Sequence, residues 1–365
     1  MSKKNFSKYW EVRNLEALLL CLAFRGSAAE RRLMGSFFEL FSFGELTQGD
    51  SLEEALFLLR EVYRRLHLEE ASLLAECARL EKRLLEREIS FINLLDDRFP
   101  PLLRRISSCP FGLFYRGDIE LMKQACVSVV GTRKPSSDSI RMCEQIAFSM
   151  KDREVCAVSG LAFGVDSLIH KSCLKHGVKT ISVLPSCVDR PVPIHNAHIA
   201  RSILDAGGLL LSENPPGYLV HKGSYVERNR IISGVSEKTL VLEAAIKSGS
   251  MSTAGFAIEQ DRDLYAMPGS ISNPSAGGCN LLISRGARPL LDAEELFSSY
   301  PKSKKSEERK ELHSELLAYI RERGRVEVDE LIRVLGIGEV ELITRLSEYE
   351  IFGYIRRSLT YVEAL

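Results

Sequence analysis

The chain has 365 residues, of which 45% are hydrophobic and 27% charged, a composition typical of a folded protein with about two or three domains. Lys plus Arg and Asp plus Glu number 49 each, so the net charge excludes a polycationic nucleic-acid binder but not a local basic groove. The nine cysteines include no C-x-x-C pair, and the sequence has neither a signal-peptide pattern nor a run of about 18 apolar residues. We therefore expect a cytoplasmic protein with reduced thiols and no metal site.

The first part of the chain, residues 1–90, has no strand pattern and is expected to be helical. Residues 51–63 start with Ser-Leu-Glu-Glu, which is typical of a helix N-cap followed by acids in the first turn. A further helical run covers 69–88. These patterns predict a small N-terminal helical domain of the SAM or helix-hairpin-helix type, for which plain packing is a commoner role than DNA binding.

Residues 99–118 combine prolines, aromatic residues and a closing Gly-Asp. Their apolar density is too high for a solvated coil, so we expect a linker that packs across the following domain.

An α/β pattern follows, in which short apolar runs alternate with helical segments over residues 91–298. Helices are expected at 140–150 and 196–204, and buried strands at 127–130, 155–158, 180–184, 208–211, 239–242 and 264–266. This alternation predicts an extended Rossmann-like parallel sheet covered by helices. The first two strands end in turns at Gly131 and Ser159-Gly160, which would place two concavities of backbone amides at one edge of the sheet.

The composition becomes polar and charged over 299–309, which predicts a linker. Helices expected at 310–323, 328–335 and 340–349, followed by strands between 354 and 362, give the order of a winged helix over 310–365. Its third helix carries four glutamates against Arg345, and an acidic helix is repelled by duplex DNA. We therefore favour a protein contact or internal docking for this domain.

The first glycine turn, G-T-R-K-P-S, argues against a nucleotide cofactor. No P-loop and no G-x-G-x-x-G is present, and Arg133 stands where a dinucleotide site needs glycine. A guanidinium at this place can instead bind a phosphate through two hydrogen bonds.

The segment 221–236 contains Lys222, Arg228 and Arg230 around Tyr225, with Asn229 between the arginines. Basic residues interleaved with an aromatic ring suit single-stranded nucleic acid, where cations contact phosphates and the ring stacks on a base. A solvated helix face or an ion-pair network is the alternative interpretation.

A helix start is expected near Ser252 and Thr253, after Ser248-Gly249-Ser250. Its amides and hydroxyls could hold an anion, or the hydroxyls could simply cap the helix. The titratable groups of the α/β segment are expected to be structural rather than catalytic: Asp166, His170, Glu213 and Glu243. No catalytic residue and no cofactor is assigned.

Nine motifs stand in one order across residues 99–298: FPPLLRRI, LFYRGD, SVVGTRKPS, VSGLAFGVDSLIH, TISVLP, GGLLLSENPPG, RNRIISGVS, VLEAAIKSGSMSTAGFAIEQDRDLYAMPG and GGCNLLISRGA. Together they resemble the bacterial DNA-processing protein A family (DprA, or Smf). The resemblance implies a helical N-terminal domain, an extended Rossmann domain and often a winged helix. It also implies single-stranded DNA binding, dimerisation through the Rossmann-like domain and loading of the RecA recombinase during natural transformation, without turnover chemistry.

The family's phosphate and base contacts would fall on Arg133, Lys222, Tyr225, Arg228 and Arg230. With the turn residues above, the expected DNA-binding set is Gly131, Arg133, Ser159, Gly160, Lys222, Tyr225, Arg228, Asn229, Arg230, Ser248, Gly249 and Thr253.

The sequence departs from the family pattern at Asp138-Ser139, Phe163, Pro185-Ser186-Cys187 and Tyr225-Val226-Glu227. Glu227 puts an acid beside the proposed DNA path, so we expect weaker or more salt-sensitive binding than is usual. The runner-up is a nucleotide-processing enzyme of the lysine-decarboxylase-like phosphoribohydrolase type, with Glu243 near a phosphate turn at 248–253, although its P-G-G-x-G-T motif is absent. A purely structural scaffold is the third possibility.

Overall fold

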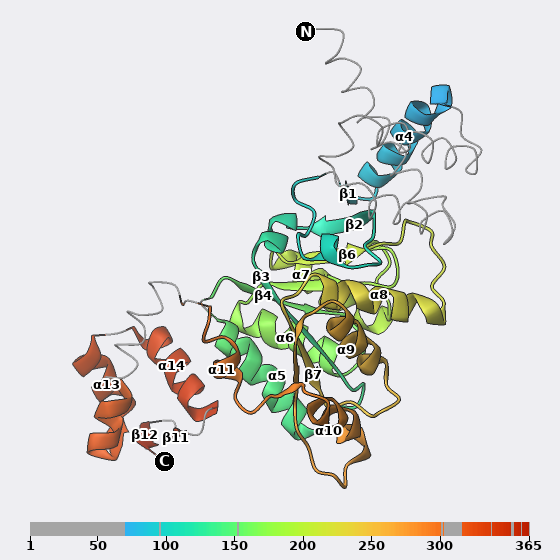
Figure 1. Cartoon of the computed structure of the whole chain (residues 1–365). Helices are drawn as coiled ribbons and strands as arrows, with labels where there is room; N and C mark the ends of the chain where they lie inside the picture. The colour runs from blue at the N-terminus through green and yellow to red at the C-terminus, as the bar shows by residue number, and fades with distance from the viewer. Residues whose placement is uncertain are drawn as a thin grey trace. The chain divides into compact units, whose positions relative to one another are not determined.

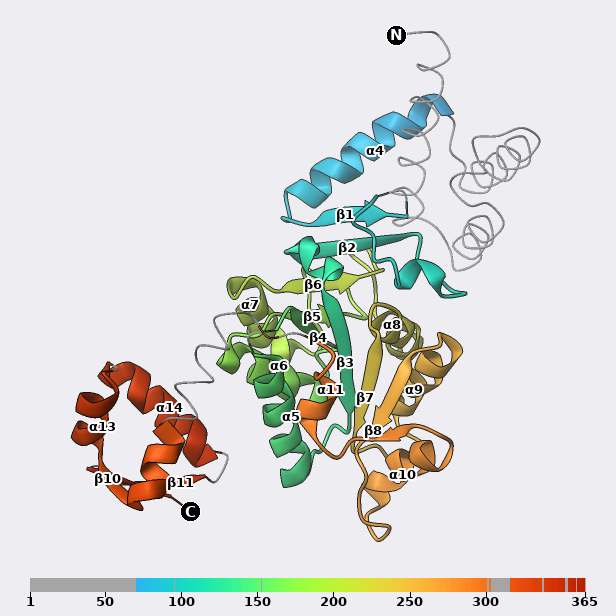
Figure 2. The ribbon, with the colours of Figure 1, turned by 60° about the vertical axis from the view of Figure 1, so that its left-hand side comes forward.

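The computed structural model describes residues 70–94, 96–151, 153–300, 302, 316–336, 338–351, 354–358 and 360–364. The chain divides into two compact units between Tyr300 and Pro301. The helices expected before residue 69 lie outside the described residues. The run expected at 69–88 is confirmed as helix α4 (Glu70–Leu85), which lies beside the first strand (Figures 1 and 2). No helix of the described residues is long and apolar enough to cross a membrane.

A nine-stranded sheet forms the centre of the first unit, in the order β1-β2-β6-β5-β4-β3-β7-β8-β9 (Figure 2). All six predicted strands are present, with bounds close to those expected: β3 (Ala125–Gly131), β4 (Val155–Ser159), β5 (Thr180–Val183), β6 (Leu209–Ser212), β7 (Lys238–Leu242) and β8 (Asp263–Ala266). These strands and β9 (Arg288–Pro289) pair in parallel. The chain adds strands on one side of β3 as far as β6 and then returns to its other side with β7. The carboxyl ends of β3 and β7 therefore form the switch point at which such sheets bind ligands.

Helices cover both faces of this sheet (Figure 2). One face carries α5 (Ser137–Met150), α6 (Val165–His176) and α11 (Ala293–Leu296), whose apolar residues share a core with Val127, Val129 and Leu240. Helix α7 (Ala197–Asp205) packs beside α6. The other face carries α8 (Lys222–Gly234), α9 (Gly249–Glu259) and α10 (Gly277–Ser284), which share the second core. The strands are apolar on both faces because both are covered, which explains their continuous apolar runs.

The expected linker at 99–118 is wrong in part, because it contains a strand. Strand β2 (Gly112–Gly117) pairs antiparallel with β6 and with β1 (Ser90–Asn93), so the sheet ends in two antiparallel strands and is not wholly parallel. Two short 3-10 helices, Leu103–Arg105 and Ile119–Lys123, flank β2. Phe99, Leu103 and Ile106 are buried in the core, so this segment packs against the domain as expected.

In the second unit, a helix covers 316–323. Strand β10 (Arg325–Glu327), α13 (Val328–Leu335), α14 (Glu339–Ile351), β11 (Ile355–Arg357) and β12 (Tyr361–Ala364) follow. The strands form an antiparallel sheet in the order β10-β12-β11. Helices α13 and α14 confirm those expected at 328–335 and 340–349, whereas β10 had no expected counterpart. The second unit has its own hydrophobic core, which contains Leu331, Leu346 and Tyr349.

Candidate functional site

The loops after β3 and β7 meet at the switch point of the sheet, and they pack tightly. Gly131 ends β3, and a Cβ added there would lie 2.0 Å from the carbonyl oxygen of Leu242, at the end of β7. The Ser250 hydroxyl, at the start of α9, donates a 2.7 Å hydrogen bond to the Gly131 carbonyl. Glycine is therefore required at 131 by the closeness of the neighbouring backbone.

Glu243, directly after β7, closes the amino end of α5. Glu243 has a left-handed backbone φ of 54° and is buried. One carboxylate oxygen accepts a 2.8 Å hydrogen bond from the Ser136 backbone amide and a 2.7 Å bond from the Ser139 hydroxyl. Burial raises the pKa of Glu243, but hydrogen bonds from Ser136, Ser139 and Asn273 outweigh it, so the pKa is lowered. A protein carboxylate thus occupies the helix end that would hold the pyrophosphate of a dinucleotide.

The amino end of α9 is left open. Ser248 is its N-cap residue, but the Ser248 side chain makes no capping bond, and its Oγ has no hydrogen-bond partner among the described residues. Gly249 is exposed, and a Cβ added there would meet no atom within 4 Å. The helix start expected at Ser252 and Thr253 is wrong, because α9 begins at Gly249. Ser252 donates back to the Gly249 carbonyl at 2.7 Å, and Thr253 is buried. An anion could therefore reach the α9 amides.

Arg228 lies inside the protein rather than on its surface, with a residual exposure of 6%. Its guanidinium donates hydrogen bonds to the carbonyls of Gly160 and Val183, which follow β4 and end β5. A Cβ at Gly160 would lie 2.6 Å from that guanidinium. Burial lowers the pKa of Arg228 to about 10, while the negative charge of the buried Asp166 opposes the shift. Arg228 therefore fastens α8 to two strand ends.

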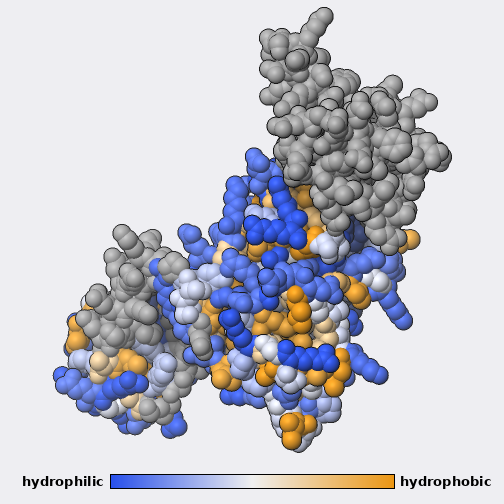
Figure 3. Space-filling view, in the orientation of Figure 1, coloured by the Kyte–Doolittle hydropathy of each residue, from blue (hydrophilic) through white to orange (hydrophobic). Residues whose placement is uncertain are grey.

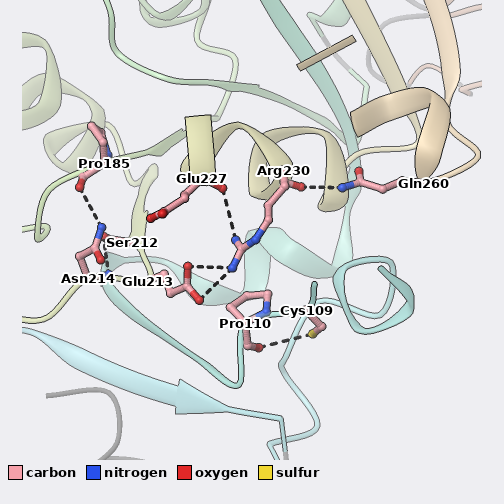
Figure 4. A network of polar contacts seen from close by, with 9 residues as sticks. All are labelled: Cys109, Pro110, Pro185, Ser212, Glu213, Asn214, Glu227, Arg230 and Gln260. Carbon is pink, nitrogen blue, oxygen red and sulfur yellow. Dashed lines mark hydrogen bonds and ion pairs between the residues drawn. The ribbon is translucent and has the colours of Figure 1, made fainter. Parts of the chain in front are cut away.

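Arg230 is committed to an ion pair. Figure 4 shows its guanidinium turned toward Glu213, with two hydrogen bonds of 2.8 and 2.9 Å to the two carboxylate oxygens. Its backbone carbonyl accepts a bond from Gln260. Asn229 is buried, and its side-chain amide donates a 2.9 Å hydrogen bond to the Ser252 hydroxyl. This bond joins α8 to α9. For Arg230, the alternative interpretation of segment 221–236 as an ion-pair network is therefore correct.

Among the twelve expected site residues, the basic and aromatic groups that reach the surface are Arg133, Lys222 and Tyr225. Arg133 and Lys222 are exposed, and neither makes a hydrogen bond or ion pair with a described residue. Lys222 opens α8, and Tyr225 follows one turn later and is half-buried. Glu227 is also exposed. These groups stand on elements that Glu243 and Arg228 hold in place.

The twelve expected site residues therefore separate into two layers. Those that reach the surface are Arg133, Lys222, Tyr225, Ser248 and Gly249. Gly131 and Arg230 are half-buried but already engaged, with Leu242 and Glu213 respectively, and the residues buried behind the surface are Ser159, Gly160, Arg228, Asn229 and Thr253. Ser159, for example, is buried and donates to the Val129 carbonyl at 2.6 Å.

The sequence did not indicate that Glu243 caps α5 or that Asp166 lies beside Arg228. A helical signal for the burial of Arg228 was available, because Arg228 lies three and four residues before Ile231 and Ile232 and so shares their face.

We expect Glu243→Gln to lower the free energy of unfolding by about 2 kcal/mol at pH 7, because hydrogen bonds to a buried charge are lost. The lowered pKa means that the folded protein takes up this proton less readily than the unfolded chain. The stabilisation is therefore complete above about pH 5 and is lost as the pH falls through the folded pKa. Urea unfolding at pH 7 and pH 4 measures this difference.

Glu259→Gln, on the exposed last residue of α9, is the matched control and should change neither value. A Glu243→Gln deficit of the same size at both pH values would contradict the proposed charge–amide interaction.

Comparison with known proteins places the first unit in a family. Residues 90–301 match the family model for DNA recombination-mediator protein A. The chain is 35% identical over 208 residues to DNA processing protein DprA of Streptococcus pneumoniae, covering 57% of this chain and 73% of that protein. It is 36% identical over 201 residues to protein Smf of Escherichia coli, covering 55% of this chain and 54% of that protein.

Two solved structures agree with these matches. The X-ray structure of DprA from Streptococcus pneumoniae superposes with a TM-score of 0.62 at 28% identity, over 80% of this chain and 98% of that one. A structure of DNA processing protein A from Helicobacter pylori, which concerns its single-stranded DNA binding mode, gives a TM-score of 0.53 at 27% identity, over 59% and 98% of the chains. The chain belongs to the DNA recombination-mediator protein A family.

Proposed function

We propose that this protein binds single-stranded DNA across the carboxyl edge of the sheet, at the switch point between β3 and β7. The observation that supports this most is the pair of exposed cations, Arg133 and Lys222, which no described residue neutralises. The half-buried ring of Tyr225 lies one turn beyond Lys222 on the same helix. Cations that follow a phosphate backbone and a ring that stacks on a base suit a single strand, whose bases are accessible.

The two layers of the site have different proposed roles. Arg133 and Lys222 contact phosphates, Tyr225 stacks on a base, and the amide of the exposed Gly249 receives a further phosphate beside Ser248, whose Oγ is buried. Gly131, Ser159, Gly160, Asn229, Arg230 and Thr253 set the shape of this surface from behind, and so does Arg228. The original expectation of direct contacts from Arg228 and Arg230 is thereby revised, because their guanidinium groups already bind Gly160, Val183 and Glu213.

No turnover chemistry is proposed. Glu243, the acid that a nucleotide-processing enzyme would use, already accepts hydrogen bonds from Ser136 and Ser139. The P-G-G-x-G-T phosphate turn of the phosphoribohydrolase group is also absent from the sequence. We therefore propose a non-enzymatic protein without a cofactor, acting in the cytoplasm where its DNA would be found. Release of free base from AMP would contradict this proposal.

We propose four parts for the chain: a helical domain over 1–90, the DNA-binding domain over 91–298, a linker over 299–309 and a winged helix over 310–365. The third helix of the winged helix, α14, is an unsuitable duplex reader. Its Arg345 is buried and pairs with Glu341 at 2.6 Å, so this arginine is not available to a phosphate, whereas Glu339 and Glu350 of the same helix are exposed acids. A protein contact is the proposed role. Deletion of residues 310–365 should leave oligonucleotide binding unchanged if this is correct.

We further propose that the protein acts as a homodimer through its Rossmann-like domain and loads RecA on the bound strand during natural transformation and recombination, as its family membership suggests. RecA assembly on single-stranded DNA coated with a single-strand binding protein should be faster in the presence of this protein. An unchanged assembly rate would contradict the loading step, and a monomeric mass by light scattering would contradict the dimer.

We expect Arg133→Ala and Lys222→Ala each to weaken binding to oligo-dT about tenfold, or about 1.4 kcal/mol. Each lost phosphate contact should also lower the slope of log K against log salt by about 0.7, the value for single strands. Fluorescence anisotropy at several salt concentrations measures both quantities.

The matched controls are Lys171→Ala on α6 and Arg201→Ala on α7, which remove exposed cations away from the proposed path. They should leave the affinity and the slope close to those of the parent chain. If neither Arg133→Ala nor Lys222→Ala differs from these controls, the site assignment is wrong.

A further inference from the structure

We infer that Phe163 is a base-stacking residue, next to Arg133, that extends the bound strand from the β3 loop onto the β4 loop. This inference rests on the proposed function and adds a position to the same site. It concerns a residue whose large aromatic ring is exposed at the carboxyl edge of the sheet.

The backbone before Phe163 is held by side-chain hydrogen bonds. The Asn196 side chain donates to the carbonyl of Leu161 at 2.8 Å. The Asp166 carboxylate accepts backbone hydrogen bonds from Gly160 and Ala162. Ligand binding to such a loop costs little conformational entropy, because the loop is already held in one conformation.

The same loop touches the Arg133 backbone. Gly164, the residue after Phe163, has a left-handed φ of 81°, and a Cβ there would lie 2.2 Å from the Thr132 carbonyl oxygen and 2.6 Å from the Arg133 Cα. The Val165 amide donates a 3.1 Å hydrogen bond to that Thr132 carbonyl. The exposed ring therefore stands one residue away from a direct backbone contact with an exposed cation.

The ring itself is accessible. Phe163 is 44% exposed, and its one ring contact within the described residues is with the exposed His195, at 6.0 Å between centroids and 53° between planes. Apolar and hydrophilic side chains are interspersed on the face of the sheet-bearing unit that Figure 3 shows, so an exposed apolar residue alone carries little meaning. What carries the inference is an exposed ring on a loop whose backbone touches that of the exposed Arg133, at a sheet edge where ligands bind.

A cation and an aromatic ring presented by two loops in backbone contact match the repeating chemistry of a single strand. The guanidinium of Arg133 takes the phosphate, and the ring of Phe163 offers its face to the adjoining base. Tyr225 would then stack on a different base, along α8. The strand would run from α8 past Arg133 to Phe163, without a need for base-specific hydrogen bonds.

The test compares Phe163→Leu with the parent chain on two ligands of equal length, oligo-dT and an abasic oligonucleotide. Leucine keeps the apolar bulk but lacks the ring. We expect Phe163→Leu to weaken oligo-dT binding about tenfold, as loss of one stacked base does, and to leave binding to the abasic strand unchanged. Phe163→Trp should bind oligo-dT at least as well as the parent chain. The control Tyr354→Leu, which removes a ring of 42% exposure from the second unit, should have no effect.

The outcomes separate this inference from the proposed function. If Phe163→Leu binds oligo-dT like the parent chain, or loses both ligands equally, Phe163 does not stack on a base, while a defect in Arg133→Ala would still support the site. If the parent chain fails to bind oligo-dT, both the inference and the proposed function are overturned.

Discussion

The buried guanidinium of Arg228 is the interaction on which the carboxyl edge of the sheet depends. A charge inside a protein is costly unless hydrogen bonds and an opposite charge compensate for it. Arg228 meets this requirement through the carbonyls of Gly160 and Val183 and the neighbouring Asp166. One side chain of α8 therefore fixes the ends of β4 and β5, and Asp166 in turn holds the loop that presents Phe163.

A second constraint, the Glu243 carboxylate at the amino end of α5, supports the proposal that this Rossmann-like sheet binds a polymer rather than a dinucleotide. The helix end that usually receives a pyrophosphate is filled by the protein itself. The amino end of α9 has no side-chain cap, and the Arg133 side chain makes no hydrogen bond with any described residue. The proposed function thus follows from which polar groups the fold has already satisfied and which remain available on the surface.

The sequence predicted the centre of the sheet well, because parallel strands buried on both faces need continuous apolar runs such as those of β3 and β4. It did not predict β1 and β2, whose short antiparallel segments at the sheet edge include Gly112, Gly117 and aromatic residues that also suit a packed linker. It predicted that the segments of the proposed site meet at one edge of the sheet, but it did not separate the buried cations from the exposed ones. Arg228 and Lys222 lie in one basic stretch of the sequence. In the structure, Arg228 is on the packed face of α8 and is buried, whereas Lys222 is at the start of the helix and is exposed.

The most direct test of the account is photocrosslinking of the full chain to oligo-dT containing 4-thiothymidine, with the attachment sites mapped by mass spectrometry. The account predicts attachment in the loops after β3, β4 and β7 and at the start of α8, that is within 131–135, 160–164, 243–252 and 221–226. Attachment concentrated in the second unit, or on the sheet edge formed by the amino ends of the strands, would contradict it.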